Sequence, residues 1–251
     1  MNDQKKNALK GREDISRFVV HLTRDDKDDF TDGGTAEDNF RAIIEDRRIG
    51  AYQPHCIHSK EIPDKLRPQY SVACFTEVPL TQLHLLTRRI PGRKICLEPY
   101  GFIFLREFII EKGAQPAIYI NSYNNNPWLR EAADVLCDIA RSKEFKAGKL
   151  WRFLPFLNAM HERYDFTWER EWRVRGDVEF KPEDVVAVIL PETDSEEWRN
   201  TFALRGIAVL SPGLSYEEII GELSQQQRKT RSIWVERKRR VRRSKGKEVN
   251  V

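Results

Sequence analysis

The sequence predicts a single α+β domain with a mixed, mainly antiparallel (split) sheet and surrounding helices. Short β-rich runs alternate along the chain with segments of helical periodicity. Several predicted strands are joined by loops too short for a parallel crossover, so these strands should pair in antiparallel fashion. No internal repeat and no linker divides the middle of the 251-residue chain. We therefore expect one domain over 15–227, between a disordered N-terminus, 1–14, and a basic tail, 228–251.

The first half of the chain begins with a strand and a capped helix. Phe18–Leu22 is a β-rich run that predicts the first strand. Thr35 and Asp38 have the spacing of a capping box, so we expect a helix that begins there and ends at Ile49-Gly50. Further strands are predicted over 72–75, 100–105 and 117–120, and a helix from Pro79 to Leu86.

The second half contains the strongest predicted strand pair. Thr167–Val174 and Val185–Leu190 carry dense apolar patterns on either side of a polar turn, and we predict that they are central neighbours in the sheet. Helices are predicted over 128–145, over 195–204 and from Ser215, with a strand over 207–210 between the last two.

Charge is distributed unevenly along the chain. The basic segment Arg228–Lys247 holds 11 Lys and Arg residues and one Glu, a local charge of +10. The whole chain carries +4, so the remainder carries −6. A nucleic-acid partner would therefore bind at this segment, where Trp234 offers an aromatic ring for stacking. The alternative is a segment that is merely solvated.

Composition points to a cytoplasmic protein without a metal. The start of the chain is polar, and no apolar run reaches the roughly 18 residues of a membrane span. Four scattered cysteines without a CxxC pair fit reduced thiols. His55-Cys56-x-His58 holds three potential ligands, but zinc needs four and no second pair is present. The GxGxxG, P-loop, GxSxG and HExxH motifs are also missing from the sequence, which argues against the common nucleotide, lipase and zinc-protease classes.

An acidic and aromatic motif offers the first candidate for chemistry. If the run 168–173 is a strand, Glu169, Glu171 and Arg173 share one face and Trp172 points into the core. One interpretation is an ion-pair ladder on a solvated face. The other places one carboxylate in a cleft, where it stabilises a developing cation or takes a proton.

Two further polar groups stand at strand ends. His21 and Thr23 share a face at the end of the first strand, although a lone histidine is more often a structural hydrogen-bonding residue. Thr76 and Glu77 follow a buried strand at the turn into a helix, where they either cap that helix or line a site.

Four sequence blocks follow one another along the chain: Val72–Leu80, Glu98–Gly101, Gly113–Tyr119, and Glu169-x-Glu171-Trp172-Arg173. In this order they resemble AbiGi-type abortive phage resistance proteins, a bacterial family. The resemblance covers about residues 15–210 and leaves the basic tail outside. It implies a phage-defence or toxin–antitoxin component and a cognate defence or antitoxin protein as partner.

The order of these features is also similar, more remotely, to ADP-ribosyltransferases, in which a split sheet clamps NAD. By this resemblance His21 and Thr23 would hold the ribose or adenosine of NAD, and Phe75 would stack on nicotinamide. Glu171 would be the catalytic acid, and Glu169 the preceding acid of an E-x-E pair.

Two hypotheses of different class follow. The first is a phage-defence or toxin–antitoxin enzyme that transfers ADP-ribose from NAD to a macromolecule. The alternative is a non-enzymatic, antitoxin-like regulator that binds a protein partner, or nucleic acid through the basic segment. Convergence of His21, Phe75 and Glu171 in one cleft would favour the enzyme.

Overall fold

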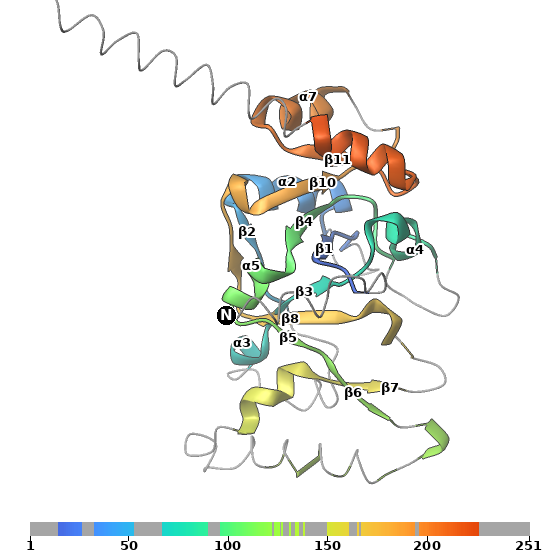
Figure 1. Cartoon of the computed structure of the whole chain (residues 1–251). Coiled ribbons are helices and arrows are strands. Elements are labelled where there is room, and N and C mark those ends of the chain that lie inside the picture. The colour runs from blue at the N-terminus through green and yellow to red at the C-terminus, as the bar shows by residue number, and fades with distance from the viewer. Residues whose placement is uncertain are drawn as a thin grey trace, which may run out of the picture.

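A seven-stranded sheet with the order β11-β10-β4-β1-β3-β8-β5 organises the computed structural model (Figure 1). Every neighbouring pair is antiparallel except β10 and β11, which confirms the mixed, mainly antiparallel sheet. The strands are β1 (Phe18–Leu22), β3 (Val72–Thr76), β4 (Gly101–Leu105), β5 (Gln115–Pro116), β8 (Glu171–Arg175), β10 (Val185–Ile189) and β11 (Ala208–Leu210).

The structure describes most of the chain from residue 15 to residue 225. The described residues are 15–26, 33–52, 67–89, 96–121, 123–125, 127, 131, 134, 135, 138, 150–160, 165, 167–193 and 196–225. Four predictions therefore lie outside them, wholly or largely: the N-terminus 1–14, the His55-Cys56-x-His58 motif, the helix over 128–145 and the basic segment. Within the described part, no helix is both long and apolar enough to cross a membrane.

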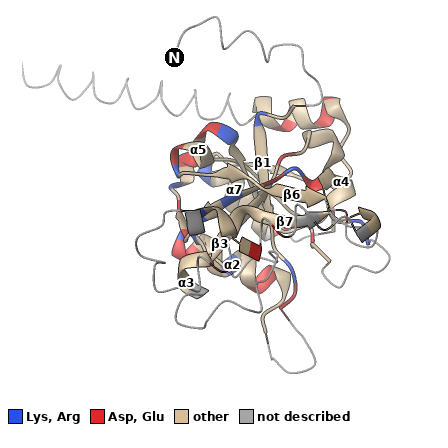
Figure 2. Cartoon of the chain, turned by 90° about the horizontal axis from the view of Figure 1, so that it is seen from below, with Lys and Arg blue, Asp and Glu red and all other residues tan. Residues whose placement is uncertain are grey.

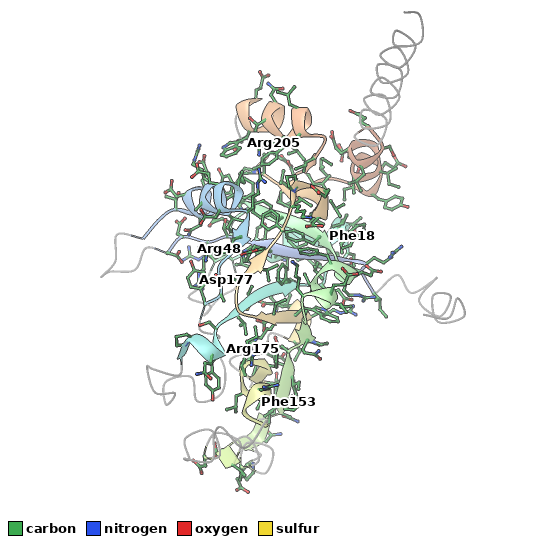
Figure 3. The ribbon with its side chains drawn as sticks, turned by 90° about the vertical axis from the view of Figure 1, so that its left-hand side faces the viewer. Phe18, Arg48, Phe153, Arg175, Asp177 and Arg205 are labelled. Carbon is green, nitrogen blue, oxygen red and sulfur yellow. The ribbon has the colours of Figure 1, made fainter. Side chains whose placement is uncertain are left out.

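Two small sheets flank the main one. The strands β2 (Arg48–Ile49) and β9 (Val178–Glu179) pair in antiparallel fashion, whereas β6 (Ile118–Asn121) and β7 (Leu157–Met160) pair in parallel. The Arg48 guanidinium donates a hydrogen bond to Asp177 beside the first of these sheets (Figure 3). In Figure 1 the second lies beyond β5, at the end of the main sheet opposite β11.

Alternation along β4 explains how both faces of the sheet are covered. Phe102 and Phe104 point to one face, where Phe40 of α2 packs against Phe102 with ring centroids 4.8 Å apart. Ile103 points to the other face and packs in a second apolar cluster with Leu83 of α4 and Ile219. The helices are α2 (Ala36–Asp46), α3 (Arg67–Tyr70), α4 (Leu83–Leu86), α5 (Arg106–Glu111), α7 (Glu196–Arg205) and residues 216–225.

Short 3-10 helices complete the described connections. They are η3 (Leu80–Gln82), η4 (Tyr123–Asn125), η6 (Leu150–Phe156), η7 (Thr167–Glu169) and η8 (Pro182–Asp184).

The predicted capping box at Thr35 is confirmed, but the helix that it starts is shorter than predicted. The Thr35 hydroxyl accepts from the Asp38 backbone N–H, and the Asp38 carboxylate accepts from the Thr35 N–H. The helix ends at Asp46 because Arg47 is left-handed, with φ 52°. This turn frees Ile49 to enter β2 and to bury its side chain completely.

The prediction that Thr167–Val174 and Val185–Leu190 are central neighbours is wrong. β8 pairs with β3 and β5, and β10 pairs with β4 and β11. The connection between them is no simple polar turn, because Val178 is buried in the core and its strand β9 pairs with β2. The chain thereby passes from one end of the strand order, where β8 lies beside β5, to the other end, where β10 lies beside β11. The first part of the predicted strand, Thr167–Glu169, is a 3-10 helix.

Candidate functional site

The candidate site is centred on the pairing of β3 with β8. Two of the sequence blocks singled out above are direct partners: Cys74 lies opposite Arg173, Phe75 opposite Trp172, and Thr76 opposite Glu171. β3 also pairs with β1, where Val20 lies opposite Thr76. Because side chains alternate along a strand, this register decides which polar residues share a face.

The sequence-predicted residues lie on two faces of the sheet. His21 contacts Phe75, with ring centroids 5.8 Å apart, and Phe75 shares its face with Trp172. Glu171 is one residue out of phase with Trp172 and therefore points to the opposite face. The structure brings His21 and Phe75 together but does not bring Glu171 to them. The three do not line a common cleft.

Glu171 is held by a bidentate ion pair with Arg173. The Nε of Arg173 donates to one carboxylate oxygen and Nη2 to the other, each at 2.9 Å. The side chains are only 12% and 2% exposed. Arg173 also donates from Nη1 to the carbonyl oxygen of Pro155 at 2.7 Å, which fastens η6 to the sheet. The arrangement is neither a solvated ladder nor an uncompensated acid, because a buried guanidinium balances the carboxylate.

The carboxylates of this face change the proton affinity of their neighbours. Burial, and next the charge of Glu171, raise the pKa of the Cys74 thiol well above its usual value. Burial, Glu171 and Glu169 likewise raise the pKa of Tyr119, whose hydroxyl lies 3.5 Å from Glu171. Burial opposes ionisation of Arg173, but Glu171 outweighs it and raises the pKa of the guanidinium. Both Cys74 and Tyr119 are therefore protonated at neutral pH.

His21 and Thr23 make structural contacts. The Nδ1 atom of His21 is hydrogen bonded to the Cys74 carbonyl oxygen at 2.9 Å. Burial lowers the pKa of His21, and this hydrogen bond opposes the shift only in part. The buried Thr23 hydroxyl lies within hydrogen-bond distance of the Ala36 and Tyr100 carbonyl oxygens, at 2.7 and 3.0 Å, at the start of α2. Phe75 is 1% exposed in the core.

Glu77 is a buried carboxylate with three partners among the described residues. One oxygen, Oε2, accepts from Trp172 Nε1 at 3.0 Å and from Arg106 Nη1 at 3.2 Å. The other, Oε1, lies 3.1 Å from Arg170 Nη2 without an aligned hydrogen bond, so this contact is electrostatic. The Glu77 side chain is 4% exposed. It makes no capping hydrogen bond to the following 3-10 helix, contrary to one of the two interpretations of its position.

Sequence reasoning missed the partners of these carboxylates. Arg106 directly follows the apolar strand β4, and Tyr119 lies in the small sheet with β7. An arginine immediately after an apolar strand is a signal that could have been noticed. Nothing in the local pattern says that it reaches Glu77, because the two residues are 29 positions apart.

No metal centre is evident in the part of the chain that the structure describes, where no three His, Cys, Asp or Glu side chains are grouped suitably. The comparisons with known proteins identify no family. No protein-family model matches the chain, and neither a curated protein nor a solved structure is significantly similar to it.

We expect Glu77→Gln to destabilise the protein by about 3 to 5 kcal/mol, because it leaves two arginines without their buried counter-charge. Glu107→Gln is the matched control, since it breaks the exposed pair with Arg17 and should change the free energy of unfolding by less than about 0.5 kcal/mol. Urea denaturation of both variants measures the difference. Equal, small losses would show that Glu77 does not hold the strands together.

We expect His21 to make stability depend on pH below its ordinary pKa of 6.5. Its pKa is lowered in the folded state, so the unfolded chain binds the proton more readily. The contribution of His21 is therefore complete above pH 6.5 and is lost as the pH falls below it, by at most about 1.4 kcal/mol per pH unit.

His21→Asn tests this expectation, because its amide can replace Nδ1 but does not titrate. Denaturation between pH 5 and pH 8 should show a smaller loss of stability at low pH in the variant than in the wild type. Identical pH profiles would exclude His21 as the origin of the effect.

Proposed function

We propose that this chain is an antitoxin-like regulator of a bacterial phage-defence or toxin–antitoxin system, and that it binds nucleic acid through the basic segment Arg228–Lys247. The observation that carries the proposal is the charge asymmetry: +10 in this segment against −6 in the rest of the chain. Such a segment displaces counterions from phosphates and supplies affinity that does not depend on sequence.

The structure supports an anchored origin for the segment. Residues 216–225 form a helix, and the N–H and hydroxyl of the preceding Ser215 donate to Glu218. Ile219 on this helix is 4% exposed and packs in the apolar cluster that contains Ile103 of β4. The basic segment thus follows a helix that is fixed to the sheet, so that the charges are tethered to the domain.

The placement of the NAD-assigned residues favours the regulator over the transferase. A nicotinamide ring stacked on Phe75 would be separated from Glu171 by the sheet itself, because the two residues point to opposite faces. The charge of Glu171 is also balanced by Arg173, which weakens it as a stabiliser of a developing cation. His21 and Thr23 bind backbone carbonyl groups inside the domain.

Truncation after Gln227 should abolish most nucleic-acid affinity and leave the free energy of unfolding nearly unchanged. If the segment neutralises about five phosphates, the log of the affinity of the full chain should fall with log salt at a slope of roughly −4 to −5. Fluorescence anisotropy with a labelled oligonucleotide measures the affinity and its dependence on salt.

The matched control is Trp234→Ala in the full chain, which keeps every charge of the segment. It should keep the salt slope and lose only the stacking contribution, about 1 to 3 kcal/mol if the indole stacks on a base. A truncated chain that binds as tightly as the full chain would refute the proposal. The cognate protein partner would then remain as the ligand of the regulator.

One observation keeps ADP-ribosyl transfer as a second candidate: the Glu171 carboxylate lies 3.5 Å from the Tyr119 hydroxyl, on the face of the sheet away from Phe75. In this case Glu171 is the catalytic acid, and NAD lies on its face of the sheet rather than on that of Phe75. A fixed carboxylate of this kind stabilises an oxocarbenium ion, and its removal costs about 2.7 to 4 kcal/mol of activation free energy.

Glu171→Gln should then lower NAD consumption about 100-fold or more, relative to the folded fraction of each protein. The correction for folding is needed because the variant leaves buried Arg173 without its counter-charge. Glu179→Gln on β9 is an exposed control that should keep full activity. No NAD turnover in the wild type, or equal turnover in wild type and Glu171→Gln, would remove this candidate.

A further inference from the structure

The helix over residues 216–225 leaves two large apolar side chains exposed to solvent. Its buried side is formed by Ile219, which is 4% exposed and packs in one apolar cluster with Leu210 of β11. Tyr216 and Ile220 lie one turn apart on the helix and are 66% and 43% exposed. In Figure 1 this helix is the last coloured ribbon of the chain. A helix that is anchored to the sheet thus carries an apolar stripe on its outer side.

The same helix is acidic. It carries Glu217, Glu218 and Glu222 and no Lys or Arg, so its side chains contribute a charge of −3. These glutamates are among the positions drawn in red in Figure 2. Glu217 precedes Ile220 by three positions and therefore borders the apolar stripe. The backbone N–H and the hydroxyl of Ser215 lower the pKa of Glu218, which keeps this carboxylate ionised at neutral pH.

Cations on the neighbouring elements do not neutralise this helix. α7 packs on the opposite face of the sheet, with Phe202 against the other apolar cluster, and its two Glu and two Arg residues balance one another. α4 packs in the same cluster as Ile219 and is followed by the exposed Arg88 and Arg89. Neither arginine forms an ion pair with a described residue. The charge of the helix remains at −1 even when both arginines are counted with it.

The basic segment has the complementary composition and lies within reach. It carries a charge of +10 and holds the apolar run Ile233–Val235 among its cations. This run begins eight residues after Gln225, the last described residue. Eight extended residues span up to about 26 Å, whereas the helix is only about 15 Å long, so the run can reach Tyr216 and Ile220 of its own chain. The same helix of a second copy would instead bring like charges together.

We propose that the basic segment docks on the helix over 216–225 of its own chain, with Ile233–Val235 against Tyr216 and Ile220 and its cations beside Glu217. Burial of the apolar side chains fixes the position of the contact, and the opposite charges favour it over contacts elsewhere on the domain. The consequence for regulation rests on the proposed function. Cations that are held by the helix are not free to displace counterions from phosphates, so a nucleic acid has to compete with this contact.

Limited trypsin digestion of the full chain at low ionic strength tests the contact, because trypsin cleaves after the Lys and Arg residues of the basic segment. Ile220→Ser removes part of the apolar stripe, and Ile110→Ser is the matched control, since Ile110 is 48% exposed on α5. Wild type and Ile110→Ser should be cleaved in the segment at equal rates, and Ile220→Ser about tenfold faster, because the docked state loses apolar burial. Equal rates in the two variants would overturn the proposal. Protection that increases with protein concentration would also overturn it, in favour of the segment of a second copy.

Glu217→Gln tests the electrostatic part of the contact, with Glu111→Gln on α5 as the matched control. At low ionic strength the segment of Glu217→Gln should be cleaved about threefold faster than that of Glu111→Gln, and high salt should remove the difference because it screens exposed charges. A difference that does not depend on salt would exclude the role of charge in the contact.

The affinity for a labelled single-stranded oligonucleotide tests the consequence for regulation. Ile220→Ser should bind the oligonucleotide up to tenfold more tightly than Ile110→Ser, about the factor by which the docked state is weakened. Equal affinities would overturn the competition between helix and nucleic acid. Failure of the full chain to bind the oligonucleotide would refute the proposed function, whereas the digestion experiment involves no nucleic acid and decides on the contact separately.

Discussion

Three segments of the chain meet at the carboxylate of Glu77, and the centre of the sheet depends on this contact. Glu77 directly follows β3, and Arg106 begins α5 after β4. Arg170 precedes β8, and Trp172 is its second residue. A carboxylate that is almost fully buried is tolerated only with charged and hydrogen-bonding partners. The requirement for these partners therefore fixes how the ends of β4 and β8 lie relative to β3.

The same pairing explains why polar residues are concentrated in two sequence blocks. The block around Cys74 and the block around Trp172 face each other across two antiparallel strands, and each supplies partners for the other. On one face Trp172 donates to Glu77, and on the opposite face Glu171 and Arg173 pair with each other. A concentration of acidic, basic and aromatic residues can thus serve the pairing of two strands inside a sheet as well as catalysis.

The function proposed here separates two tasks along the chain. The folded part holds its buried carboxylates in ion pairs, Glu77 with Arg106 and Arg170, and Glu171 with Arg173. The basic segment supplies a high density of positive charge. Electrostatic attraction through such a segment is strong but does not depend on the sequence of the nucleic acid.

The sequence by itself determined the local elements: the capping box at Thr35, the strand Phe18–Leu22 and the mainly antiparallel character of the sheet follow from short-range patterns. Those patterns state which residues of one strand share a face. They do not state which strands pair, so the separation of β8 from β10, the placement of Glu171 opposite to Phe75 and the contacts of Glu77 were decided by tertiary structure. The physical reason is that a one-residue change of register exchanges the two faces of a strand, and only packing of the whole core selects one register.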